Sequence, residues 1–591
     1  MNKVDMLIAS ITDQSRILYD DHIRFLYKDE YIKVLKDVFG IYDDCEGIFD
    51  NTHLLTTQKL AFVELIYPFL HYAKKKISKD IDLINIAKTA MDDMECLLLE
   101  NLSKLSAQAF FFKFSKVIGT GYNTSGFDAY FEDTKPNSDC LADRMKYDMF
   151  VSDFLKNRWG EFFLEYSALA MLMAVLTQQW ITMLINFTDA FLRDYTDIRK
   201  TFFKEGSKGS ILSIKAAEHN GLNLEDITLI INFDNNEKLI YKAKNIEVDR
   251  CFQAFLDWIN NKCKSIPLKC MRMITADHYG WQEYVPQEAC LSEAEVKHFY
   301  FRAGMLLGVL YVFGSSDMHC LNLIANGEYP VLIDMEALTG SSCDTNVLNT
   351  HFLPCHSFVV DGRLEYSNAL SSETFTRSLM KDLHWEHVNT DKMKPVYRHR
   401  EVSPKSVVYH SDKKVYSYLY LDQLLKGFNF MYEYVMDHKK MVFNSIVKNF
   451  SSCEVRYYPR VYRNYFYTIY NSLAPEYLKS GADRLAILQK TLDKTSMQLQ
   501  QTPEEIKIYE LEQLSVNSIP RFNISYKEGT LKGFNDITIN ELHLKAPMST
   551  VKARINRLCR SDLEQQNTLI RKAFQDYKTN ITTHETELYY V

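Results

Sequence analysis

The sequence predicts an α+β protein of several domains in which helix predominates. The chain has 591 residues, whereas a single domain typically has about 150, so several domains are expected. Apolar residues recur at helical spacing along most of the chain, whereas strand-like runs are short and concentrate between Lys204 and Val285. Only 20 Gly and 13 Pro are present, so long disordered linkers are not expected.

Region 1–200 is expected to be helical and to act as a scaffold or substrate-docking region. Its apolar residues follow helical spacing, as in Leu60, Phe62, Leu65, Ile66, Phe69 and Leu70. The stretch from Tyr166 to Thr188 carries no charge and is long enough to cross a bilayer. It contains three amides, each of which would need a partner inside lipid: Gln178, Gln179 and Asn186. A buried helix, and no transmembrane segment, is the expectation; membrane contact is the alternative.

Region 201–290 has the pattern of a small nucleotide-binding lobe. Two apolar runs, Ile227 to Phe233 and Lys238 to Lys242, flank four polar residues and predict a hairpin, and Met271 to Val285 predicts further strand. Lys242 lies at a strand end before a helix, where a lysine can reach nucleotide phosphates. Lys244 is the competing candidate, and either lysine could instead be a solvated surface residue.

Region 291–445 is expected to carry the chemistry. Ser292 and Glu295 form a capping-box pattern that begins a helix ending near Gly314. Two apolar runs then flank Asn326-Gly327, which predicts a hairpin that places Asp334 opposite His319. Pro330 cannot donate to this ladder and weakens the register. Region 446–591 reads as helical again, with a loop-rich interruption around residues 515–535 and an arginine motif.

The residues around this hairpin suit phosphoryl transfer from ATP with Mg²⁺. That reaction needs a base for the attacking hydroxyl and hard oxygen ligands for the metal. Asp317 is the candidate base, with His319 supporting it. The candidate metal ligands are Asn322, Asp334 and, as an additional or outer ligand, Glu336. The competing interpretation is that these side chains only cap loops and a strand end.

The composition bears on two questions: which partners the protein binds and in which cell compartment it lies. The net charge of −7 gives no basic surface of the kind that nucleic acid binding requires, so nucleic acid is not expected as a partner. The 12 Cys are scattered without a C-x-x-C pair, and no secretory signal opens the sequence. We therefore expect reduced thiols and a cytoplasmic protein.

Several motifs together resemble the dehydratase portion of class II lanthipeptide synthetases, the LanM-type enzymes. They are Tyr241-Lys242, Val248-Asp249, Tyr279-Gly280-Trp281, Arg302-Ala303-Gly304, Ser316-Asp317-Met318-His319, Tyr329 to Glu336, Gly427-Phe428 and Asp562 to Gln566. The resemblance implies a lipid- or protein-kinase-like bilobal core with large helical N-terminal and C-terminal extensions. It also implies a precursor peptide with a leader as substrate, whose Ser and Thr are phosphorylated and then lose phosphate to give dehydroalanine and dehydrobutyrine.

The resemblance assigns a second set of catalytic residues to phosphate elimination. The family's elimination motif has an arginine followed six residues later by a threonine, and this chain has Arg456 and Tyr462 there. A tyrosine hydroxyl lies farther from the backbone than a threonine hydroxyl. Two alternatives to the dehydratase therefore remain. One is a peptide kinase without elimination, and the other is a non-catalytic peptide-binding partner of a separate enzyme. No cyclase zinc motif is found, so a separate LanC-like cyclase and an export transporter are expected partners.

Overall fold

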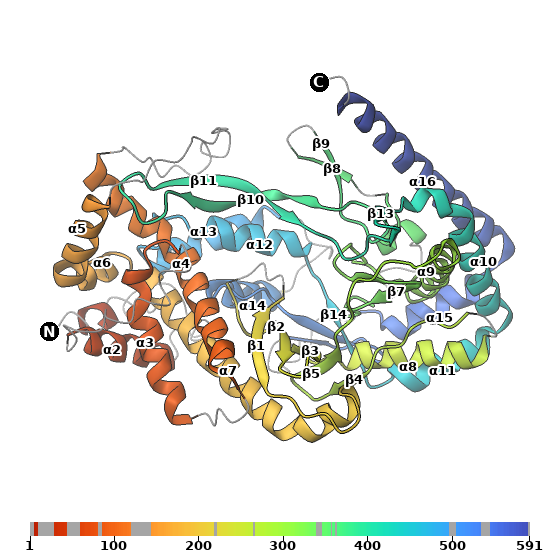
Figure 1. The fold of residues 1–591 in the computed structure, drawn as a ribbon, viewed down its shortest axis with the longest axis horizontal. Helices are drawn as coiled ribbons and strands as arrows, with labels where there is room; N and C mark the ends of the chain where they lie inside the picture. The colour runs from red at the N-terminus through yellow and green to blue at the C-terminus, as the bar shows by residue number, and fades with distance from the viewer. Residues whose placement is uncertain are drawn as a thin grey trace. The chain divides into compact units, whose positions relative to one another are not determined.

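A computed structural model gives the structure of the chain. It describes residues 5–9, 29–43, 60–80, 86–119, 144–217, 222–263, 266–338, 346–355, 357–360, 363–495, 504–533 and 544–588. The chain divides into two compact units that alternate along the sequence (Figure 1). Unit 1 comprises Met1–Lys244, Leu383–Arg398 and Tyr458–Pro520; unit 2 comprises Asn245–Asp382, His399–Tyr457 and Arg521–Val591. The two are described separately below.

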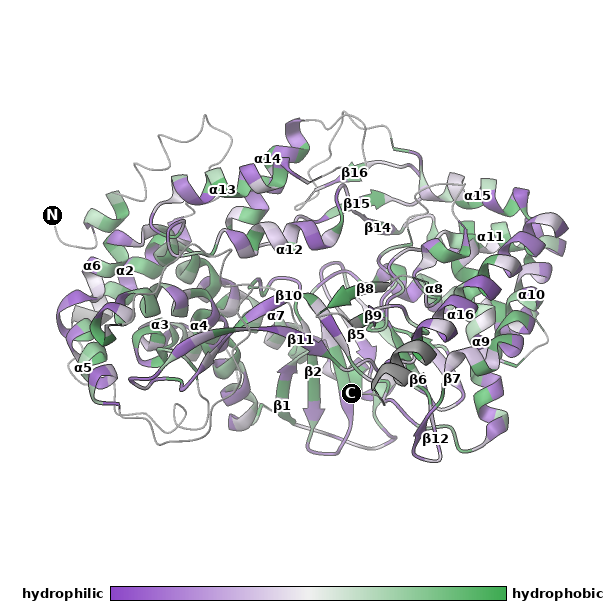
Figure 2. Ribbon diagram, turned by 90° about the horizontal axis from the view of Figure 1, so that it is seen from above, coloured by the Kyte–Doolittle hydropathy of each residue, from purple (hydrophilic) through white to green (hydrophobic). Residues whose placement is uncertain are grey.

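Unit 1 is mainly a helical assembly, as expected for region 1–200. Its helices are α2 (Asp29–Asp43), α3 (Val63–Asp80), α4 (Lys88–Ile118), α5 (Met145–Asp153), the π-helix η4 (Phe154–Arg158), α6 (Trp159–Glu165), α7 (Ser167–Phe202), α12 (Tyr462–Asn471), α13 (Gly481–Asp493) and α14 (Glu504–Ser515). Apolar residues, green in Figure 2, are concentrated on α3 and α4. Rings pack edge to face in this core, as for Trp159 and Phe163 at 4.9 Å.

Helix α7 corresponds to the uncharged stretch of the sequence. Among the described residues it is the one helix long and apolar enough to cross a membrane, and 83% of its most apolar window is buried within the protein. Its indole Trp180 donates to the carbonyl of Met94 in α4 at 2.9 Å. The expectation of a buried helix is therefore confirmed, because packing inside unit 1 accounts for the apolar composition.

Three antiparallel strands follow α7 in unit 1: β1 (Ile211–Ala216), β2 (Thr228–Phe233) and β3 (Lys238–Lys242). The expected hairpin is present, with Asn232 opposite Lys238 and Thr228 opposite Lys242. Asn236 adopts a φ of +65° in the turn, a conformation that asparagine tolerates better than most residues. Lys242 ends β3, as predicted.

A long ribbon of two strands, β10 (Thr376–Glu386) and β11 (Lys394–Val402), contributes its tip to unit 1. In the tip, the Asp391 carboxylate accepts the backbone N–H of Tyr147 at 2.8 Å. Asn389 accepts from the Tyr147 hydroxyl and from the N–H of Phe62, both at 2.9 Å. The tip therefore satisfies donors at the start of α5 and of α3 that would otherwise lie unpaired.

Unit 2 contains the helices α8 (Glu247–Lys262), α9 (Glu293–Phe313), α10 (Leu421–Asp437), α11 (Lys439–Phe450), α15 (Pro547–Arg557) and α16 (Arg560–Leu588), with 3-10 turns η5 (Val347–Thr350) and η6 (Ser417–Tyr420). As expected, Ser292 caps α9 by accepting the N–H of Glu295. Helices α9 and α10 approach closely: a Cβ added at Gly304 would lie 2.0 Å from the Leu424 carbonyl oxygen, and one at Gly427 would lie 1.9 Å from that of Phe301. Only glycine fits at these positions.

Within unit 2 the strands pair in antiparallel fashion: β4 (Met273–Thr275) with β5 (Gly280–Glu283), β6 (Leu323–Asn326) with β7 (Tyr329–Leu332), β8 (Ser357–Val360) with β9 (Arg363–Tyr366), β12 (Tyr409–His410) with β13 (Lys413–Lys414), and β14 (Glu454–Tyr457) with β15 (Phe522–Ser525), which also pairs with β16 (Leu531–Lys532). The last sheet corrects the expectation of helix and loop after residue 446. Strands β14 and β15 pair across 65 residues of sequence, a contact that local periodicity cannot indicate.

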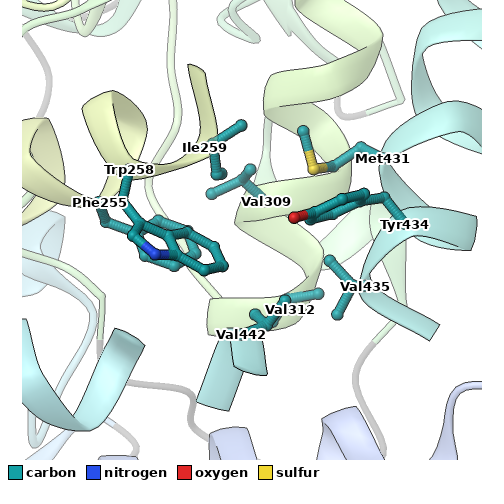
Figure 3. Close-up of a pocket in the computed structure, with 9 residues that line it drawn as sticks. All are labelled: Phe255, Trp258, Ile259, Val309, Val312, Met431, Tyr434, Val435 and Val442. Atoms are coloured by element: carbon teal, nitrogen blue, oxygen red, sulfur yellow. The ribbon is translucent and has the colours of Figure 1, made fainter. Parts of the chain in front are cut away.

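Four helices of unit 2 enclose a small apolar cavity (Figure 3). Its lining comes from α8, α9, α10 and α11: Phe255, Trp258, Ile259, Val309, Val312, Met431, Tyr434, Val435 and Val442. The volume in which the centre of a water molecule could lie is about 10 Å³, which is about the minimum for one water. We interpret it as a packing gap between helices.

The described residues confirm a predominantly helical α+β chain. The kinase-like bilobal arrangement and the four sequence regions remain predictions. The boundary between Lys244 and Asn245 lies inside region 201–290, and Tyr458–Pro520 join unit 1 with the N-terminal helices, whereas Arg521–Val591 belong to unit 2.

Candidate functional site

The hairpin β6–β7 positions the candidate residues of unit 2, but not in the register expected. Asn326 pairs with Tyr329, so Gly327 and Glu328 form the turn. Gly327 has a φ of +56°, as the first turn residue of a type II′ hairpin requires. The predicted pairing of Asp334 with His319 is therefore wrong by two residues, and the N–H of Ile333 donates to the Asn322 carbonyl instead. Because side chains alternate with a period of two, this shift leaves each side chain on its predicted face.

The register differs because Asn326 has a buried role of its own. Its amide accepts from Lys269 at 2.6 Å and donates to the Glu288 carboxylate at 2.8 Å. Pro330 lies opposite Ala325, whose N–H points away from β7 and donates to the Lys405 carbonyl at 2.8 Å. Residues 325 and 330 are therefore a pair without hydrogen bonds between the two strands, so the missing N–H of proline costs no bond there.

Asp317 lies in a tight loop immediately after α9. The helix ends at Gly314 with a φ of +67°, and the N–H groups of Gly314 and Ser315 donate back to the carbonyls of Tyr311 and Leu310. Asp317 itself has a φ of +74°, a left-handed conformation that aspartate tolerates through local hydrogen bonds. The Asn322 amide donates to the Asp317 carbonyl at 2.9 Å and so closes the loop.

His319 is oriented by its own loop. The N–H of Leu321 donates to Nδ1 of His319 at 3.2 Å, which leaves the ring proton on Nε2. That Nε2 lies 3.9 Å from Oδ1 of Asp317, within reach of an electrostatic interaction but beyond a hydrogen bond. His319 and Asp317 keep 34% and 47% of their side-chain surface exposed, so both are accessible to a substrate.

Asp334 and Glu336 follow β7 on a segment that α8 holds in place. Oδ1 of Asp249, a buried residue of α8, accepts the N–H of Met335 between them at 3.0 Å. The N–H of Glu336 donates to Oδ1 of Asp334 at 3.3 Å. Asp249 was not predicted as a site residue from the sequence. The available signal was a carboxylate on the apolar face of a helix, where an acidic side chain needs a partner.

Arg456 lies beside these carboxylates. Its Nη1 is 2.9 Å from Oε1 of Glu336, and its backbone N–H donates to the Glu336 carbonyl at 2.9 Å. The guanidinium is largely buried, with 9% of the side chain exposed, and Glu336 keeps 18%. Strand β14 therefore carries the elimination candidate to the metal-ligand candidates, 120 residues earlier in the chain.

The electrostatics of this group, called here the carboxylate cluster (Asp317, Asp334 and Glu336), favour a cation. Desolvation raises the pKa of Asp317, and the negative charges of Glu336 and Asp334 raise it further, while His319 and Arg456 oppose them.

The donor set fits Mg²⁺, which prefers carboxylate and amide oxygens. Asn322, Asp334 and Glu336 would hold it, and its charge would offset the negative charges of Glu336 and Asp334, which add to desolvation in raising the pKa of Asp317. No sulfur or second imidazole is needed, in keeping with a hard metal.

The remaining candidates belong to unit 1, so the contacts within unit 2 do not test their part in the site. Lys242 is buried at the end of β3, and Lys244 follows it half-buried. Tyr462 begins α12 with 43% of its surface exposed, and its ring lies 6.2 Å from that of Tyr458. Arg460, four residues after Arg456, pairs with the buried Glu510 at 3.0 Å within unit 1.

Comparison of the sequence with known proteins assigns the chain to a family. Residues 166–525 match the family described as "Domain of unknown function (DUF4135)", and this span includes every candidate residue named above. The chain is also similar to the lacticin 481/lactococcin biosynthesis protein LcnDR2 of Lactococcus lactis subsp. lactis, with 26% identity over 432 residues. The alignment covers 65% of this chain and 43% of that relative, so the chain spans less than half of the relative's length. These matches confirm the family resemblance drawn from the motifs, and the chain belongs to the DUF4135 family.

Proposed function

We propose that this protein is an ATP-dependent lanthipeptide dehydratase, which phosphorylates Ser and Thr of a precursor peptide and then eliminates the phosphate. The observation that carries the proposal is the charge-coupled group of Asp317, His319, Asp334, Glu336 and Arg456 around one hairpin. The relative's role in lacticin 481 biosynthesis supports a peptide of that class as substrate.

In the first step, Asp317 accepts the proton of the attacking Ser or Thr hydroxyl. His319 stands beside Asp317 with its Nε2 proton available to an oxygen of the transferring phosphoryl group. Magnesium held by Asn322, Asp334 and Glu336 would neutralise charge on the nucleotide phosphates. Lys242 or Lys244 is proposed to contact the nucleotide within a kinase-like bilobal core.

In the second step, the substrate α-proton passes to a base, the electron pair of the Cα–H bond forms the Cα=Cβ double bond, and the Cβ–O bond breaks to release phosphate. Arg456 is suited to stabilise the departing phosphate, because a guanidinium binds phosphate through paired hydrogen bonds. Its ion pair with Glu336 places it beside the group proposed for the first step, so one cluster would serve both. Tyr462 is the proposed replacement for the threonine of the elimination motif. Cytoplasmic location, a separate LanC-like cyclase and an export transporter complete the proposal.

Mass spectrometry of the precursor peptide after incubation with the full chain, ATP and Mg²⁺ tests the proposal. Loss of one water per modified residue supports dehydration. Accumulation of phosphopeptide would instead favour the kinase without elimination, which the Thr-to-Tyr difference at Tyr462 makes a specific alternative. An unchanged peptide, together with no ATP consumption, would favour the non-catalytic peptide-binding role.

A further inference from the structure

Two buried cysteines and a glutamate converge in unit 2, apart from the carboxylate cluster. Cys251 lies on α8, and Cys453 lies in the loop before β14; their sulfur atoms are 2.9 Å apart. Glu247 is one helical turn before Cys251, and its Oε1 lies 3.6 Å from the Cys251 sulfur. One ligand atom from each residue lies within 4.8 Å of the other two. Among the described residues, this is the one group of three or more such side chains at this spacing.

We propose that Glu247, Cys251 and Cys453 form a binding site for a structural zinc-like divalent cation. Two thiolates and a carboxylate are ligands that zinc accepts, with a water or another group in the fourth position. Tetrahedral ligands at about 2.3 Å from the metal place two sulfurs roughly 3.8 Å apart. The sulfurs therefore separate by about 1 Å on binding, which a χ1 rotation of roughly 30° in one cysteine provides.

The surroundings supply the charge balance that such a site requires. Two thiolates, one carboxylate and a divalent cation sum to one negative charge. Arg250 bonds the Glu247 carboxylate through both Nε and Nη2, and Nη2 also lies 3.7 Å from the Cys251 sulfur. The Thr275 hydroxyl donates to the same carboxylate at 3.2 Å. Outer partners of this kind orient metal ligands.

The surroundings of the two sulfur atoms are buried. The hydrogen bond with Cys453 and burial raise the pKa of Cys251. Burial, and then the neighbouring Cys453, raise the pKa of Tyr526, whose hydroxyl has no hydrogen-bond partner among the described residues. Binding converts both thiols to thiolates and releases two protons to solvent.

The position of the site gives it a structural consequence. Helix α8 carries Asp249, which holds the N–H of Met335, and β14 carries Arg456, which pairs with Glu336. A cation joining Cys251 to Cys453 would fix the two elements that hold the Asp334 to Glu336 segment. It would bind outside the carboxylate cluster, and its existence does not depend on the proposed function.

Titration of the reduced full chain with Co²⁺ tests the site. We expect one Co²⁺ per chain, a thiolate-to-cobalt charge-transfer band, displacement by Zn²⁺, and no displacement by excess Mg²⁺. Glu247→Gln should lower the Co²⁺ affinity by more than about tenfold, because losing even a group that only hydrogen-bonds a metal ligand costs about that much.

Cys453→Ser should abolish the charge-transfer band, whereas the matched control Cys263→Ser, a buried cysteine at the end of the same helix, should retain it. A wild-type chain without the band, or Cys453→Ser with the band unchanged, would overturn the proposal. A count of free thiols in the denatured, non-reduced protein gives a further test. Two thiols fewer than the 12 cysteines supply would also overturn the proposal, because the pair would then be a disulfide.

Discussion

Two arginines four residues apart in the chain, Arg456 and Arg460, each pair with a glutamate, yet their surroundings differ. In unit 1, Glu510 is fully buried and takes hydrogen bonds from Arg460 and from the Tyr465 hydroxyl. Arg460 also donates to the carbonyls of Leu492 and Thr495. In unit 2, Glu336 is partly exposed and lies near two further carboxylates.

The first pair is closed, since both side chains are almost fully buried, and the second is open, since Glu336 keeps 18% of its side chain exposed. Further hydrogen bonds from Tyr465 and to two backbone carbonyls surround the closed pair, which is typical of a pair that fixes the fold. In the open pair, the charge of Glu336 adds to desolvation in raising the pKa of Asp317. An ion pair therefore indicates a functional site when it is partly exposed and lies beside a group with a perturbed pKa.

The largest effect is expected for Asp317→Asn, which removes the proposed base. Asparagine keeps the side-chain shape and tolerates the φ of +74°, so the loop should be retained. Phosphopeptide formation should fall by about 10²- to 10⁴-fold, the usual contribution of a general base. Single-turnover assays measure the loss. Retained phosphorylation would show that the open cluster is not the phosphoryl-transfer site.

The same substitution should change stability with pH in a defined direction. Because the Asp317 pKa is raised in the folded protein, its ionised form destabilises the fold at neutral pH, and that cost disappears as pH falls through the raised pKa. Asp317→Asn should therefore raise Tm at neutral pH, with a gain that shrinks on acidification. Activity of the wild type should rise with pH through the same range. A Tm difference independent of pH would contradict the assignment.

The second effect is on stability in unit 1. Glu510→Gln leaves the Arg460 charge buried without its counter-ion, so the free energy of unfolding should fall by about 3–5 kcal/mol. Phosphorylation per folded molecule should not change. Denaturant unfolding together with an assay normalised to folded protein measures both. A loss of activity without a loss of stability would mean that the closed pair also serves catalysis.

The third effect separates elimination from phosphorylation. Arg456→Lys keeps the charge but loses the paired donors of the guanidinium. We expect phosphopeptide to accumulate, with a stability loss of about 1–3 kcal/mol from the weakened charged hydrogen bond to Glu336. The time course of phosphorylated and dehydrated peptide is the measurement, with Arg463→Lys on α12 as the matched control. Equal slowing of both steps would assign Arg456 to phosphoryl transfer.

The smallest effect on stability is expected for Tyr462→Phe. The side chain is 43% exposed, so the free energy of unfolding should change by no more than about 0.5 kcal/mol. If the tyrosine hydroxyl replaces the threonine of the motif, dehydration should slow while phosphorylation continues. Unchanged dehydration would show that Tyr462 has no role in the elimination step. The variant Tyr462→Thr then tests whether the threonine of the family motif makes dehydration faster.

Much of the secondary structure could be predicted because its signals are local. The capping residue Ser292, the uncharged stretch that became α7 and the turn between β2 and β3 each lie within a few residues of what they determine. The grouping of Asp317 with Asp334 was also recoverable, since an error of two in register preserves the faces of a hairpin.

The rest depends on contacts that sequence periodicity does not encode. The turn moved to Gly327-Glu328 because Asn326 is held by Lys269 and Glu288, which lie at least 38 residues away in the chain. Strand β14 exists because β15 pairs with it, and that pairing brings Arg456 to Glu336. Val248-Asp249 is one of the motifs of the family resemblance, but Asp249 received no role because the sequence does not indicate its partner, a backbone N–H of a distant segment.

The glycine contacts between α9 and α10 restrict how the site of unit 2 can move. With backbones this close, neither helix can slide or rotate against the other without atomic overlap, so the pair must travel as one rigid body. Any closure around a nucleotide would then bend at the connecting loops, of which the one after Gly314 carries Asp317. Amide hydrogen exchange should accordingly be slow along both helices.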